Sequence, residues 1–205
     1  MNWIEFKSRM FDFGCFSVNQ VYGWQPGFDR NNLARWVRRG YLLRLRQGTY
    51  TFPEYRDRPD MAVYFASRIY NPSYISLHTA LSAYGLIPES VAQITSVTSL
   101  KTARFANAFG EYSYKSVRED LMFGYEPRLL AGGRMAPYAT REKALLDLLY
   151  LYPFYNTAHE LAELRLDRAA LHAYLDRERL ESFAARYRSI AFAKRVRLLQ
   201  EVYEL

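Results

Sequence analysis

Cysteine is nearly absent from this chain of 205 residues, in which Cys15 is the only one. A single thiol excludes an intramolecular disulfide and a zinc site built from several thiolates. A free thiol also fits a reducing compartment, so we expect the protein in the cytoplasm.

Long apolar runs are also missing. No stretch approaches the roughly 20 apolar residues that a membrane-spanning helix needs, so no membrane association is expected. Residues 1–6 lack the basic and apolar segments of a secretory signal peptide. Half of the residues are nevertheless apolar, which supplies a substantial core and argues against global disorder.

Patterns that hold metals or phosphates are lacking as well. The three histidines, His78, His159 and His172, share no spacing typical of metal ligands. Gly132 and Gly133 are not followed by the Lys-Ser or Lys-Thr of a phosphate-binding loop. We therefore expect neither a metal nor a cofactor.

A catalytic constellation is only weakly indicated. Glu142, Asp147 and His78 are the residues that a nuclease or another hydrolase would use. Glu142 fits the first turn of a helix, where negative charge is favourable. Asp147 interrupts an apolar helix and needs a basic or capping partner. Ser76 is expected to cap a helix near His78. The sequence thus predicts no enzyme, with a hydrolase delivered by a DNA-binding domain as the alternative.

Acidic residues are absent from residues 30–46, a segment that holds six arginines. Residues 1–58 carry ten Lys or Arg against five Asp or Glu, whereas residues 59–205 carry eighteen against sixteen. The net charge of +7 therefore sits mostly in the first part. Arginine suits bidentate contacts with phosphate and guanine, so a polyanionic partner is indicated.

The pattern around these arginines predicts a winged helix-turn-helix. Helical spacing covers residues 3–13 and ends at Gly14. Ser17 is expected to cap a helix over residues 18–22, and Asp29 a second helix that ends at Gly40. Alternating apolar and basic residues over 41–46, a turn at Gln47-Gly48 and a return over 49–52 predict a hairpin.

The predicted DNA-binding residues lie on that helix and hairpin. The N-terminal half of a recognition helix reaches base edges, its end favours phosphates, and a wing tip contacts the backbone or minor groove. The set is Arg30, Asn31, Asn32, Arg35, Arg38, Arg39, Arg44, Arg46 and Gln47. One alternative to a DNA-binding surface is an ordinary solvated helix face without a binding role, but such faces usually mix charges of both signs. A winged helix that mediates protein contacts is the other alternative.

A charged linker at residues 54–59 divides the expected α+β fold. The winged helix-turn-helix domain is expected at residues 1–57 and a larger mixed α/β domain at 60–205. The second domain should hold helices at 61–69, 77–84 and 141–151, strands at 93–99, 110–117 and 121–125, and a hairpin turn at 132–133. From residue 157 the pattern is helical, and it ends in a helix at 190–203. Its apolar stripe of Phe192, Val196, Leu199 and Val202 would dock a partner if exposed.

The order of motifs resembles the AbiEi-type antitoxins of bacterial type IV toxin–antitoxin systems, which act in abortive infection and phage defence. The first part carries Phe16-Ser17, Leu33-Ala34-Arg35-Trp36, Gly40-Tyr41-Leu42 and Arg46-Gln47-Gly48-Thr49-Tyr50. Residues 76–81, 84–89 and 139–148 extend the resemblance, which covers most of residues 16–151.

The resemblance implies a transcriptional autorepressor that binds repeats in double-stranded DNA upstream of its own operon. Inverted repeats would imply two copies of the chain on DNA. It also implies an antitoxin whose C-terminal domain neutralises a nucleotidyltransferase-like toxin without a stable complex. The DNA-contacting role falls on the helix and wing residues, and no residue of the second domain is assigned a role.

Overall fold

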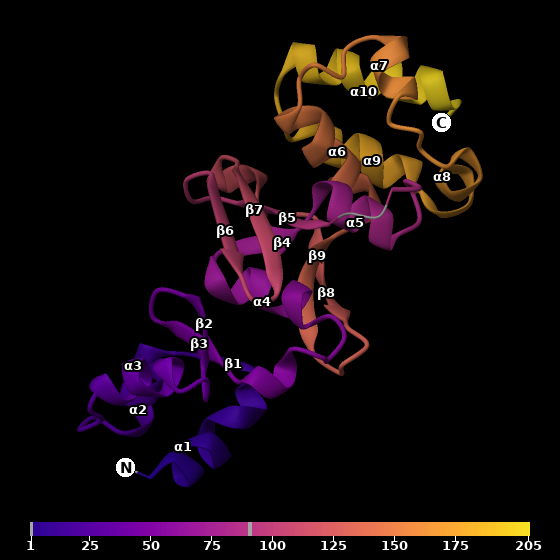
Figure 1. The fold of residues 1–205 in the computed structure, drawn as a ribbon. Coiled ribbons are helices and arrows are strands. Elements are labelled where there is room, and N and C mark those ends of the chain that lie inside the picture. The colour runs from indigo at the N-terminus through magenta and orange to yellow at the C-terminus, as the bar shows by residue number, and fades with distance from the viewer. Residues whose placement is uncertain (1, 90–91) are drawn as a thin grey trace.

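A computed structural model describes residues 2–89 and 92–205 of the chain. Figure 1 shows an elongated molecule in three parts, with the N-terminus and the C-terminus at opposite ends. A small winged helix occupies one end, a six-stranded sheet the middle and a group of helices the other end. The expected mixture of helices and strands, with a helical C-terminal region, is confirmed.

The winged helix begins with α1 (Trp3–Met10) and a short 3-10 turn, η1 (Phe11–Phe13). It continues with β1 (Cys15–Ser17), α2 (Val18–Trp24) and α3 (Asn31–Arg38). The hairpin of β2 (Leu43–Arg46) and β3 (Thr49–Thr51) completes it, and β3 lies between β1 and β2 in one antiparallel sheet. Ser17 caps α2 as expected, with Gln20 closing a reciprocal capping box.

The middle part is one sheet of order β6-β7-β5-β4-β9-β8. Its strands are β4 (Ser73–Ile75), β5 (Gln93–Thr98), β6 (Ala103–Asn107), β7 (Gly110–Ser116), β8 (Tyr125–Leu129) and β9 (Met135–Ala139). The pairs β5–β7 and β4–β9 are parallel and the others antiparallel. The strand expected at residues 121–125 is wrong, because the 3-10 turn η3 (Glu119–Leu121) comes first and β8 starts only at Tyr125.

The first helices that follow the winged helix pack on this sheet. The short turn η2 (Pro53–Tyr55) leads from the winged helix to α4 (Met61–Ile69), which packs on β4, β5 and β9. Next, α5 (Leu77–Ala83) packs on β5 and on α6 (Arg141–Leu151). The C-terminal group is α7 (Ala158–Ala162), α8 (Arg168–Tyr174), α9 (Arg177–Ala185) and α10 (Ile190–Tyr203).

The apolar stripe of α10 is an internal packing surface. Phe192, Val196 and Leu199 are buried, and Val202 packs against the same core. The docking surface that this stripe would have formed if exposed is therefore not available.

Polar contacts join the winged helix to the sheet from two sides. On one side the Tyr64 hydroxyl donates to the Phe13 carbonyl over 3.0 Å, and the Arg134 guanidinium donates to the Asp12 carbonyl over 3.0 Å. On the other side the Asn107 amide donates to the Leu45 carbonyl over 3.2 Å. Buried apolar residues of both parts form one cluster, so the winged helix is packed on the sheet as well as hydrogen-bonded to it.

Gly14 permits the first of these contacts. Its φ of +74° is a conformation that residues with a Cβ rarely adopt, and an added Cβ would lie 2.9 Å from Arg134 Cζ and 3.1 Å from Tyr64 Cε1. We predict that Gly14→Ala lowers the free energy of unfolding by roughly 1–3 kcal/mol, measured by urea denaturation. Gly40→Ala is the control, because Gly40 has a φ of +72° but no atom within 4 Å of an added Cβ. Equal losses in both variants would mean that the contact with Arg134 and Tyr64 adds nothing.

Candidate nucleic-acid interface

The buried face of α3 fixes which side of the helix meets solvent. Leu33 and Trp36 are buried, and the Trp36 ring lies 4.6 Å from Phe6 and 5.0 Å from Trp3, between ring centroids. The helix begins one residue later than expected, but the Asp29 carboxylate still accepts from the Asn31 amide over 2.9 Å. Gly40 follows the helix with a positive φ of 72°.

The opposite face of α3 is exposed and cationic. Its exposed polar side chains are Arg30, Asn31, Arg35, Arg38 and Arg39. Seven ion pairs occur within residues 2–89 and 92–205, and none of them uses an arginine from positions 30 to 46. Because none of these ion pairs neutralises them, the guanidinium groups keep their charge for a partner.

The wing places further polar groups beside the start of α3. Arg44 and Gln47 are exposed, and Gly48 adopts a φ of 78° in the turn. The β2–β3 register shifts between Arg44 and Arg46, which marks a bulge in β2. A hollow of about 610 Å³ is lined by Arg30 from the start of α3 and by Arg44, Arg46 and Gln47 from the wing. The helix and the wing therefore present cationic side chains to one common space.

Two of the predicted residues are used inside the protein. Asn32 is buried at 8% exposure and its side-chain oxygen accepts a hydrogen bond from Arg35. Arg46 donates to the Ile69 carbonyl over 2.8 Å, and its guanidinium lies 4.9 Å from the Tyr70 ring centroid and 4.5 Å from that of Phe105. Asn32 therefore orients Arg35, and Arg46 anchors the wing to the sheet.

The sequence did not reveal the neighbours that complete the wing surface. Ala106 and Asn107, at the end of β6, line the same hollow as the wing arginines. Asn107 also donates to the Leu45 carbonyl, 62 residues earlier in the chain. Such a contact depends on tertiary packing, and no local pattern around residue 107 indicates it.

The alternative catalytic residues have separate structural contacts. Asp147 is fully buried and pairs with Lys143, while its Oδ2 accepts from the Tyr74 hydroxyl and from the Ser76 hydroxyl, both over 2.8 Å. Ser76 holds the capping position of α5, but its hydroxyl makes no capping bond. The prediction that Ser76 caps this helix is therefore wrong, because its hydroxyl donates to the buried Asp147 carboxylate instead.

Glu142 and His78 do not join Asp147. Glu142 is buried at 3% exposure and accepts from the Asp176 amide over 3.0 Å, while the half-buried His78 packs edge-on against Tyr152. Within residues 2–89 and 92–205, no three His, Cys, Asp or Glu side chains gather as a metal site would require. The geometry of these residues gives no support to the hydrolase alternative.

No helix in the described ranges has both the length and the apolar character needed to cross a membrane. The N-terminal part, in which α2 and α3 are followed by a two-stranded wing, defines a winged helix-turn-helix.

Residues 6–53 match the AbiEi_4 family, described as transcriptional regulator, AbiEi antitoxin. The matched segment runs from α1 to the end of the wing, so the resemblance to AbiEi antitoxin regulators is confirmed there. The chain matched none of the curated proteins with which it was compared.

Proposed function

We propose that the protein binds double-stranded DNA through the exposed face of α3 and the tip of the wing. The observation that carries this proposal is the group of exposed arginines on α3, with Arg30 and Arg44 lining one hollow between helix and wing. The match of residues 6–53 to a family of transcriptional regulators supports the same conclusion.

The residues divide by their place on α3. Arg30 and Asn31 lie at the N-terminus of α3, the end of a recognition helix that reaches base edges in the major groove, and Arg35 follows Asn31 by one helical turn. Arg38 and Arg39 lie at the other end, where contacts with phosphates set the register. On the wing, Arg44 and Gln47 are placed for the backbone or the minor groove. Of the predicted set, Asn32 and Arg46 act indirectly, through Arg35 and through the position of the wing.

We further propose that the bound DNA is the control region of the protein's own operon and that the result is repression. If this region contains inverted repeats, two copies of the chain occupy it. The second part of the chain then serves as the antitoxin that counteracts a nucleotidyltransferase-like toxin. The antitoxin description of the matched family supports this role.

A DNA titration tests the proposal. Fluorescence anisotropy with a labelled fragment from upstream of the gene should give a Kd at least 1,000-fold below that of a scrambled fragment. Specific DNA-binding proteins prefer their sites over other DNA by a factor of about 10³ to 10⁷, so this is the smallest preference expected. The logarithm of the affinity should fall with the logarithm of the salt concentration by about 0.9 for each phosphate contacted. Equal, salt-independent affinities for the two fragments would contradict DNA recognition by this surface.

A further inference from the structure

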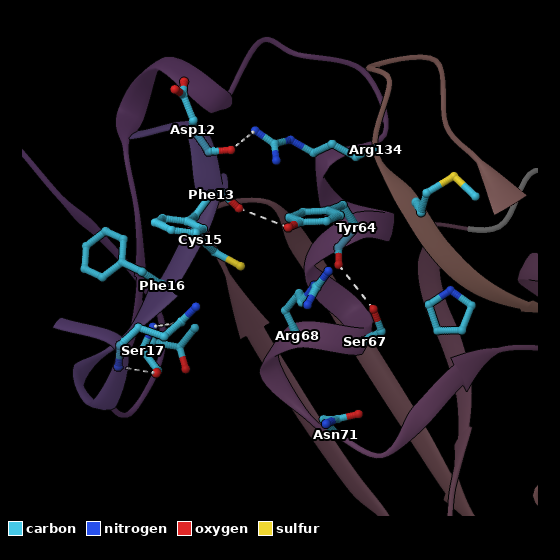
Figure 2. A pocket seen from close by; sticks show the side chains of 14 residues that line it. Asp12, Phe13, Cys15, Phe16, Ser17, Tyr64, Ser67, Arg68, Asn71 and Arg134 are labelled. Atoms are coloured by element: carbon cyan, nitrogen blue, oxygen red, sulfur yellow. Dashed lines mark hydrogen bonds between the residues drawn. The ribbon is translucent and has the colours of Figure 1, made fainter. Parts of the chain in front are cut away.

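A second hollow lies on the other edge of the small sheet, where β1 faces α4. Its volume is about 650 Å³, and its walls come from the winged helix, from α4 and from the β8–β9 hairpin. Figure 2 shows Cys15 and Ser17 on one side, and Tyr64, Ser67 and Arg68 on the other, with Arg134 closing one end. A volume of this size is typical of sites for small molecules, which span roughly 300–1,000 Å³.

Two guanidinium groups flank one aromatic ring in this hollow. Arg68 Cζ lies 5.1 Å and Arg134 Cζ 5.0 Å from the centroid of the Tyr64 ring. Arg134 is held in place because it donates to the Asp12 carbonyl over 3.0 Å and to the Tyr55 hydroxyl over 3.1 Å. Neither arginine takes part in any of the seven ion pairs of the described ranges.

The other groups in the hollow do not cancel this charge. Figure 2 shows the Asp12 carboxylate pointing away from Tyr64 and Arg68, while its backbone carbonyl faces Arg134. The Cys15 sulfur points into the hollow, and burial raises the pKa of this thiol to about 11, so it is neutral at physiological pH. Ser67 and Asn71 add neutral polar groups.

We propose that this hollow binds a small molecule that carries a phosphate group. Two arginine side chains that pair with no carboxylate of the described residues supply the positive charge that attracts a phosphate dianion. The Phe13 ring, which lines the same space, supplies an apolar face for the rest of the molecule. Of the two arginines, Arg68 is exposed to solvent and accessible to a ligand, whereas the hydrogen bonds of Arg134 hold its guanidinium group in place.

The test uses the whole chain of 205 residues and three probes: inorganic phosphate, AMP and adenosine. In isothermal titration calorimetry, AMP should bind, inorganic phosphate should compete with it, and adenosine should bind at least tenfold more weakly than AMP. Arg68→Gln should weaken AMP binding at least tenfold. Arg197→Gln is the matched control, because Arg197 is exposed on α10 at the far end of the molecule (Figure 1).

Three results would overturn the proposal. The first is that neither AMP nor inorganic phosphate binds. The second is that both variants bind AMP as the unaltered protein does, which would place the site elsewhere. The third is that Arg68→Gln lowers affinity for DNA while no small molecule binds, because the hollow would then be part of the nucleic-acid surface. Thermal unfolding of each variant establishes that a loss of binding is not a loss of folding.

Discussion

Replacing Arg30, Arg35 and Arg38 together with Ala should weaken binding to the upstream DNA of the operon by a factor of about a hundred or more. Each of these side chains is exposed on α3 and none is paired with a carboxylate in the described ranges. Removing an arginine that binds a base or a phosphate costs roughly 1–3 kcal/mol, and about 1.4 kcal/mol is a factor of ten. Fluorescence anisotropy at one fixed salt concentration measures the change.

A second triple variant distinguishes the contribution of this surface to DNA binding from the contribution of net charge alone. Arg118, Arg165 and Arg197 are exposed and lie outside the winged helix, so replacing them with Ala removes the same charge elsewhere. Only the first triple variant should also reduce the slope of the logarithm of the affinity against the logarithm of the salt concentration. The slope should fall by about 0.9 for each phosphate that the protein no longer binds. Equal losses of affinity in the two variants would show that α3 has no special part in binding.

The same α3 variant should separate the proposed repression from the proposed antitoxin activity. Because its three substitutions lie on the exposed face of the winged helix, the second part of the chain keeps its packing. In cells that express the cognate toxin from a separate promoter, the variant should restore growth as the unaltered protein does, while a reporter behind its own promoter is derepressed. Loss of both activities in a folded variant would argue against separate surfaces for them.

Replacing Lys143 with Met should lower the free energy of unfolding by about 3–5 kcal/mol, because it leaves a buried carboxylate without its counter-ion. Lys143 and Asp147 are both fully buried, and burial lowers the pKa of Lys143. Asp147 also accepts from the hydroxyls of Tyr74, Ser76 and Tyr187, so distant segments of the chain meet at this carboxylate. The loss corresponds to about 6–20 °C in Tm for a chain of this size, followed by circular dichroism.

A double-mutant cycle isolates the ion pair from the packing of the two side chains. Asp147→Asn keeps the size of the side chain and removes its charge. The double variant Lys143→Met with Asp147→Asn should be more stable than the sum of the two single losses predicts, because no unpaired charge remains. Strict additivity would mean that the Lys143–Asp147 interaction contributes nothing to stability.

The local part of the fold could be predicted from the sequence because its signals are local. Ser17 caps α2 as expected, and the Gln47-Gly48 turn joins β2 to β3. Leu33 and Trp36 form the buried face of α3, but Asn32, which was expected to contact DNA, is buried with them. The assignment of DNA contacts to the exposed side chains stays a prediction.

Short strands and long-range polar contacts could not be predicted. β4 has three residues and is buried on both faces, so it shows no alternation of apolar and polar residues. Arg46 was expected to bind DNA from the wing, but its partners Tyr70 and Phe105 come from distant segments. The same holds for Asp147, whose hydroxyl partners Tyr74 and Ser76 lie more than 70 residues away in the chain.

The aromatic cluster behind α3 gives the protein an intrinsic optical reporter. All three tryptophans of the chain, Trp3, Trp24 and Trp36, belong to the winged helix, whereas the tyrosines are spread over both parts. Indole emission therefore follows the environment of this end alone. Comparing it with the far-ultraviolet signal of the whole chain during denaturation would show whether the two ends melt together or one after the other.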